Sequence, residues 1–114
     1  MSINIKATNT TLTDALKQDI LDKISVLDDF LKPEDKIYLE VEVEPRHQSG
    51  DIYKVDINIQ PHGHYAKAEA SDMYAAIDKV MPKIREQLAK KKDKDVSLRR
   101  KLGSFYKRFF SRNP

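Results

Sequence analysis

The stretch KIYLEVEVEP, residues 36–45, decides the fold because its apolar and polar residues alternate strictly. Such alternation places successive side chains on opposite faces of a β-strand. One face carries four aliphatic side chains: Ile37, Leu39, Val41 and Val43. The opposite face carries one aromatic and three acidic side chains: Tyr38, Glu40, Glu42 and Glu44. The pattern therefore predicts a strand with one buried face and one face in solvent.

The two segments that follow continue this pattern. DIYKVDINIQP, residues 51–61, alternates again between apolar and polar residues. Its inward side chains are Tyr53, Val55, Ile57 and Ile59. YAKAEA, residues 65–70, places three alanines on one face, where their small size would let a helix lie close to the sheet. With RHQSGD and HGH as turns between them, these segments predict an antiparallel meander of three strands.

The N-terminal part of the chain adds a strand and a helix. INIKA, residues 3–7, alternates and predicts a short strand. Apolar residues then recur every three or four positions, as on one face of a helix: Leu12, Leu16, Ile20, Ile24, Leu27 and Leu31. Either Thr11 or Thr13 can cap the start of this helix, and Pro33 prevents it from continuing.

A second helix follows the meander and starts at Ser71 or Asp72. Its apolar stripe consists of Met73, Ile77, Val80, Met81, Ile84 and Leu88. Pro82 should remove one backbone hydrogen bond and bend the helix around the sheet. The predicted order of elements is β-α-β-β-β-α. The fold class is therefore α+β, with two helices packed on one face of a four-stranded sheet.

Composition limits the class of protein. The 114 residues are enough for one domain, and the chain has no cysteine, which excludes disulfides and thiolate metal sites. The N-terminus has no secretory signal pattern, and no apolar run is long enough to cross a bilayer. These features predict a soluble cytoplasmic protein that acts away from membranes.

Charge is distributed unevenly along the chain. Residues 1–71 contain 8 Lys/Arg against 13 Asp/Glu, whereas residues 72–114 contain 13 Lys/Arg against 5 Asp/Glu. Such asymmetry predicts a polyanionic partner for the C-terminal half, either nucleic acid or an acidic membrane surface.

The cations of the second helix are aligned on its exposed side. A spacing of 100° per residue predicts one ridge that contains Lys79, Lys83, Lys90 and Lys94. Lys91 lies at its boundary, and Arg85 and Lys92 flank the other side of the helix. Lysines near a helix C-terminus also serve solubility and the helix dipole. The further basic runs KKKDK, LRRK and YKR favour contacts with a phosphate backbone.

Other groups of polar residues are weaker candidates for a catalytic or metal site. Glu40, Glu42 and Glu44 face Asp56 alone, so a solvated sheet face is favoured over a metal or acid–base site. His62 and His64 have H-x-H spacing but no third ligand nearby, which indicates a turn rather than a metal site. The chain has no nucleophile motif and no glycine-rich phosphate loop. We therefore expect no enzyme activity, no metal and no cofactor.

Residues 96–114 form a basic, aromatic tail that we expect to be flexible. Leu98, Leu102, Phe105 and Phe109 share one helical face. The interleaved cations are Arg99, Arg100, Lys101, Lys107 and Arg108. Three uses are open: a disordered tail, a segment that orders on RNA, and an interfacial helix on anionic lipid. We favour disorder in the free protein and RNA contact in the bound one.

The segment AEASDMYAAIDKVMPKIREQLAKKKDK, residues 68–94, resembles the ribosome hibernation promoting factor family, which includes protein Y. The motif DMYAAID is the most specific part, and the resemblance extends over residues 2–95. It implies a fold similar to the double-stranded RNA-binding domain. It also implies binding to the small ribosomal subunit, contact with the 16S rRNA backbone, exclusion of messenger and transfer RNA, and inhibition of translation during stress.

The resemblance also implies which residues bind rRNA. Lys83, Lys90, Lys92 and Lys94 occupy basic family positions, as does Lys23 in the first helix, and Lys91 stands where histidine is frequent. Val26 and Glu86 depart from basic family positions. Residues 1–95 would form the ribosome-binding domain of a protein that is monomeric off the ribosome. Among short family members, some promote ribosome dimers and others oppose them, with the tail implicated in the difference. The tail of this chain matches neither pattern, so the resemblance leaves dimerisation open.

Three alternatives remain beside this hypothesis. The domain could bind structured RNA in general. The tail could carry a membrane or protein interaction on its own. A metal-dependent nuclease would use Glu40 and Glu42.

Overall fold

The computed structural model describes residues 1–45, 50–90 and 109. Its strands are β1 (Ser2–Thr8), β2 (Lys36–Glu44), β3 (Ile52–Gln60) and β4 (His64–Ala70). Its helices are α1 (Asp14–Ser25), the 3-10 helix η1 (Asp28–Phe30) and α2 (Met73–Ala89). Their order, β-α-β-β-β-α, confirms the predicted fold class. Neither α-helix in the described part of the chain has the length and apolar composition needed to span a membrane.

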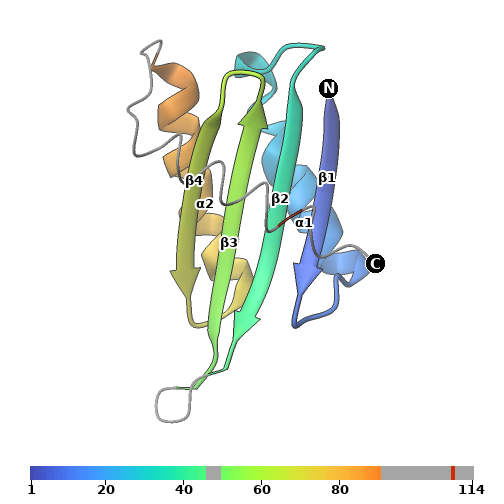
Figure 1. The fold of residues 1–114 in the computed structure, drawn as a ribbon, viewed down its shortest axis with the longest axis vertical. Helices are drawn as coiled ribbons and strands as arrows, with labels where there is room; N and C mark the ends of the chain where they lie inside the picture. The colour runs from blue at the N-terminus through green and yellow to red at the C-terminus, as the bar shows by residue number, and fades with distance from the viewer. Residues whose placement is uncertain (46–49, 91–108, 110–114) are drawn as a thin grey trace.

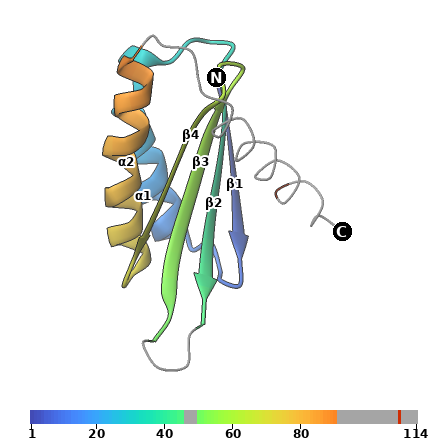
Figure 2. The ribbon, with the colours of Figure 1, turned by 60° about the vertical axis from the view of Figure 1, so that its left-hand side comes forward.

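The four strands form one sheet in the order β1-β2-β3-β4. The chain crosses from β1 to β2 through α1, so these two strands are parallel, whereas β3 and β4 each run antiparallel to the preceding strand. Strands β1 and β4 therefore lie at the two edges (Figure 1). Both helices lie on the same side of the sheet (Figure 2).

The core lies between the sheet and the two helices, as the alternation predicted. The inward side chains of β2 and β3 are fully buried: Ile37, Leu39, Val41, Val55, Ile57 and Ile59. Ala66 and Ala68 of β4 are buried against the same cluster, which brings α2 close to the sheet edge. Ala76 is buried with the predicted stripe of α2, while Met81 and Leu88 are half-buried.

Helix α1 starts where the sequence indicated but ends earlier. The Thr13 hydroxyl accepts a 3.1 Å hydrogen bond from the Leu16 N–H, so Thr13 is the cap. The helix ends at Ser25, and the chain continues through η1, so the prediction of one helix up to Pro33 is wrong. Leu27 is still buried, because a 3-10 turn keeps residues spaced by three on one side.

The helix-free face of the sheet is less exposed than the sequence indicated. Glu40 is 2% exposed, and Asp56, its cross-strand neighbour, is 9% exposed. A solvated face was the prediction for these carboxylates, and it is wrong for Glu40. Alternation shows which residues share a face, but it does not show that Phe109, far along the chain, packs on this face beside Tyr38 and Tyr65.

Candidate nucleic-acid interface

Two of the predicted ridge lysines lie along the outer edge of β4. The Lys79 ammonium donates a hydrogen bond to the backbone carbonyl of Glu69 at 3.3 Å. One helical turn later, Lys83 donates to the backbone carbonyl of Lys67 at 3.0 Å. Both ridge lysines are exposed. The side chains are thus extended over the strand edge rather than free to sample all rotamers.

Gln87 continues this row by one more turn, which sequence reasoning missed. Its side-chain carbonyl accepts a 2.9 Å hydrogen bond from the Tyr65 N–H, and its amide donates to the Tyr65 carbonyl. Four residues of helix rise about 6.0 Å, and two residues of strand rise about 6.6 Å, so a spacing of four on α2 matches a spacing of two on β4. The regular spacing from Lys83 to Gln87 was the signal in the sequence.

Lys79 and Lys83 keep their positive charge available to an outside anion. An ammonium has three hydrogen-bond donors, and a backbone carbonyl occupies one without neutralising the charge. Among the described residues, no carboxylate forms an ion pair with either lysine. The two ammonium groups therefore present aligned charge and spare donors to solvent.

Lys90 follows the last turn of α2 and is partly neutralised. Its ammonium lies 2.7 Å from Oε1 of Glu86. The hydrogen bond from Lys90, and then its charge, hold the pKa of Glu86 below the ordinary value. Glu86, which departs from the family pattern, is thus tied to a neighbouring lysine within the same helix.

Lys23 belongs to α1 and Arg85 belongs to α2. Both lie on the side of α2 that faces away from the β4 edge. The Lys23 ammonium is 2.7 Å from Asp19 and 3.0 Å from Asp78, and these hydrogen bonds raise the pKa of Lys23. The Arg85 guanidinium lies over the Phe30 ring, 5.5 Å from its centroid. Neither residue shares the surface that Lys79 and Lys83 form over β4.

The remaining predicted site residues lie outside the described residues. They are Lys91, Lys92, Lys94, Arg99, Arg100, Lys101, Lys107 and Arg108.

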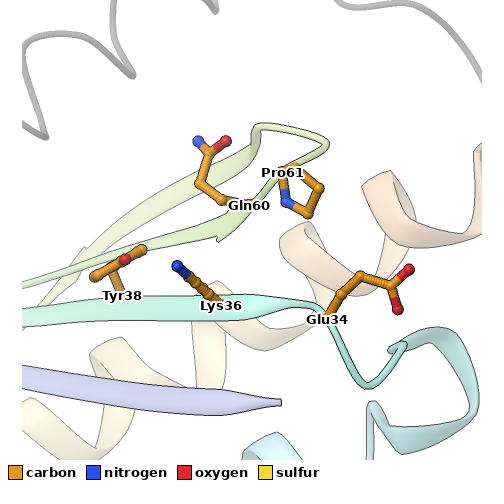
Figure 3. Close-up of a pocket in the computed structure, with 5 residues that line it drawn as sticks. All are labelled: Glu34, Lys36, Tyr38, Gln60 and Pro61. Atoms are coloured by element: carbon orange, nitrogen blue, oxygen red, sulfur yellow. The ribbon is translucent and has the colours of Figure 1, made fainter.

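The two histidines considered as a metal site, and a hollow on the sheet, are weaker candidates for a functional site. The rings of His62 and His64 are 6.2 Å apart, and the described residues contain no group of three potential metal ligands. A hollow of about 410 Å³ opens beside Tyr38 on the sheet (Figure 3). Its lining is Glu34, Lys36, Tyr38, Gln60 and Pro61. It has one carboxylate, one ammonium and one phenol, and its lining includes no Ser, Cys or His.

Comparison with known proteins finds a family model that matches most of the chain. The model of the family described as "Sigma 54 modulation protein / S30EA ribosomal protein" matches residues 3–96. The ribosome hibernation promoting factor of Klebsiella oxytoca is 34% identical over 94 residues, which cover 82% of this chain and 96% of that protein. That of Pseudomonas putida is 33% identical over 100 residues, which cover 86% and 93%.

Two solved structures share the fold. A ribosomal subunit interface protein from Coxiella burnetii has a TM-score of 0.62 at 23% identity, covering 78% of this chain and 94% of that one. The N-terminal domain of Thermus thermophilus Protein Y has a TM-score of 0.61 at 20% identity, covering 77% and 96%. With the family match over most of the chain, these findings confirm the resemblance inferred from DMYAAID. The chain belongs to the family of sigma 54 modulation proteins and S30EA ribosomal proteins.

Proposed function

We propose that this protein is a ribosome hibernation factor that binds the small ribosomal subunit and blocks translation under stress. Family membership and the names of the curated relatives support the ribosome as its target. The observation that carries the mechanism is the pair Lys79 and Lys83, exposed and extended over the β4 edge. Lysines arranged in this way neutralise phosphates without reading base sequence.

The proposed interface is centred on the β4 side of α2. Lys79, Lys83 and Lys90 contact the backbone of 16S rRNA, and the basic residues Lys91, Lys92 and Lys94 extend the contact. Lys23 and Arg85 have a smaller part, because Lys23 already pairs with Asp19 and Asp78 and Arg85 lies over the Phe30 ring of η1. The tail cations at 99–101, 107 and 108 add RNA contacts.

Inhibition on this proposal is steric. The domain of residues 1–95, a monomer in the cytoplasm, occupies the groove of the A and P sites and excludes messenger and transfer RNA. No bond is made or broken, so the mechanism needs neither a catalytic residue nor a metal.

Co-sedimentation with purified small subunits at physiological salt tests the target. We expect stoichiometric binding that messenger RNA plus initiator transfer RNA displaces. Binding that these competitors leave unchanged would contradict the groove. Equal binding to the same mass of unrelated structured RNA would instead support a general RNA-binding module.

Glutamine substitutions test the lysines without disturbing the strand edge. Gln87 shows that a glutamine on α2 can donate to a β4 carbonyl. A triple variant Lys79→Gln, Lys83→Gln and Lys90→Gln therefore removes three charges while keeping donors. We expect its affinity for small subunits to fall at least tenfold.

A matched control removes three exposed lysines elsewhere: Lys17, Lys32 and Lys36, each replaced by glutamine. The two triple variants have the same net charge, so the control separates position from total charge. Equal loss of affinity in both variants would contradict an interface on α2.

A further inference from the structure

Phe109 is held on the helix-free face of the sheet. Its side chain is 6% exposed and packs with Tyr65 and Tyr38. The rings of Phe109 and Tyr38 are 5.6 Å apart and meet edge to face at 75°. Tyr38 and Tyr65 alternate with the inward residues Leu39 and Ala66, so Phe109 packs on the side of the sheet that α1 and α2 leave uncovered. Edge-to-face pairs of this kind are attractive beyond their buried area.

The backbone of Phe109 is fixed as well as its ring. The Lys6 ammonium donates a 2.6 Å hydrogen bond to the Phe109 carbonyl, and it lies 5.4 Å from the centroid of the Phe109 ring. Tyr65, which packs on the ring, donates its hydroxyl hydrogen to Asp56 at 3.2 Å. Residues of β1, β2 and β4 thus contact one phenylalanine in two ways, through a ring site and a carbonyl site.

Charge complementarity supports a site for the whole segment around Phe109. Residues 91–114 contain nine Lys/Arg and two Asp. The helix-free face has carboxylates on two adjacent central strands, including Glu40, Glu42 and Asp56, and the first and last of these are buried. The same face also carries Lys6, Lys36, Lys54 and Lys67. The complementarity to a cationic segment is therefore local to these central carboxylates and is secondary to the contacts of Phe109.

The chain is long enough to make this contact with its own sheet. Phe109 follows Lys90, which comes after the last turn of α2, by 19 residues. An extended segment of that length spans roughly 60 Å, which exceeds the 41 Å longest extent of the molecule. A contact within one chain also avoids the entropy of bringing two molecules together.

We propose that the helix-free face of the sheet is a docking site for the chain's own cationic C-terminal segment, with Phe109 as its anchor. While docked, the Phe109 ring is buried and cannot stack on a base. The sheet therefore competes with RNA for this residue. On this proposal the helix-free face binds the C-terminal segment of the same molecule.

Nuclear Overhauser effects in the full-length protein test the docking. We expect cross-peaks between the rings of Phe109 and Tyr38, with Phe109 signals identified by the Phe109→Leu variant. Their relative intensity should not change on tenfold dilution. Absence of these cross-peaks would overturn the proposal. Cross-peaks that disappear on dilution, with tumbling of a dimer at high concentration, would assign the site to a second copy and also overturn it.

Two variants separate docking from a general loss of structure. Tyr38→Ala should move the Phe109 ring signals to free values while the core methyl signals of Ile57 and Ile77 stay unchanged. Lys6→Met, which keeps most of the side chain, should weaken the cross-peaks several-fold. Tyr74→Ala removes an exposed tyrosine of α2 and should leave them intact. Loss in the Tyr74 control, or unchanged Phe109 signals in Tyr38→Ala, would contradict the site. No ribosome is present, so the result is independent of the proposed function.

Discussion

Thr8 donates a 2.7 Å hydrogen bond to Oε2 of Glu40, and this bond joins the parallel strands β1 and β2 on the helix-free face. Thr8 is 8% exposed and Glu40 is 2% exposed. A buried carboxylate is costly unless hydrogen-bond donors surround it. The contact therefore gives Glu40 a structural role in joining the edge strand to the sheet, in place of the metal or acid–base roles weighed from the sequence.

Replacing Thr8 by valine should reveal the strength of this contact. The substitution keeps the shape of the side chain but removes the donor to a buried carboxylate, so we expect a loss of about 1.5–3 kcal/mol in the free energy of unfolding. Urea unfolding at pH 7 measures it. Thr11→Val, at an exposed position, is the control and should change stability by less than about 0.5 kcal/mol. Equal urea midpoints for the two variants would contradict the assignment.

The start of α2 gives a second comparison between neighbouring residues. Both Ser71 and Asp72 suited the cap in the sequence, and the structure assigns it to Asp72, whose carboxylate accepts a 2.9 Å hydrogen bond from the Ala75 N–H. Asp72→Ala should lower the free energy of unfolding by about 1 kcal/mol. Ser71→Ala should have little effect in the same thermal or urea titration. The reverse order would show that the helix starts one residue earlier.

Lys23 should make stability depend on pH on the alkaline side. Its hydrogen bond to Asp19, and then that to Asp78, raise the pKa above the ordinary value of 10.5. Because the folded state holds this proton more tightly than the unfolded chain, the contribution is complete below pH 10.5 and is lost as pH rises through the folded-state pKa. Lys23→Met should therefore cost about 0.2–1 kcal/mol at pH 8, and the difference from wild type should shrink toward pH 12.

Urea midpoints of wild type and Lys23→Met at several pH values measure this trend. Lys17→Met is the control, since Lys17 is exposed on the same helix. A constant difference between wild type and Lys23→Met at all pH values would mean that packing of the aliphatic chain, rather than its charge, is responsible.

Salt should weaken ribosome binding steeply. If the interface neutralises about four to six phosphates, affinity falls by about two to three orders of magnitude between 50 and 200 mM salt. Lys79→Gln with Lys83→Gln removes two cations, so the slope of log affinity against log salt should decrease in size by about 1.5. Lys17→Gln with Lys32→Gln should leave the slope unchanged. Filter binding at five salt concentrations is sufficient, and an unchanged slope in the α2 variant would exclude direct phosphate contacts by these lysines.

Much of the fold could be predicted because most strands and helices are buried on one side only. One-sided burial produces an unbroken alternation in a strand and an unbroken three-and-four spacing in a helix. The alternation of Ile37 to Val43 identified β2 and its inner face, and the spacing of Lys79 and Lys83 placed both on one side of α2. Patterns of this kind depend on neighbours along the chain. They therefore succeed for elements whose environment is set locally.

The features that were predicted wrongly or missed depend on contacts with distant parts of the chain. The apolar spacing up to Leu31 continues through a 3-10 turn, since burial constrains which side a residue faces and not the type of helix. The burial of Glu40 depends on partners from other segments, including Thr8 on β1. Gln87 continues the spacing of four from Lys79 and Lys83, but its bond to Tyr65 arises only when α2 lies beside β4. Contacts between distant segments decide these features.

The row of α2 side chains along β4 also protects the protein from other copies of itself. An open sheet edge is a template onto which a strand of another molecule can add, and proteins avoid this by placing charge or cover on the edge. Lys79, Lys83 and Gln87 occupy outward carbonyls of β4. A glutamate at either lysine position would leave its carbonyl without that donor. Precipitation of such a charge-reversed variant would then indicate polymerisation through β4, and its loss of ribosome binding would not by itself show that these lysines contact rRNA.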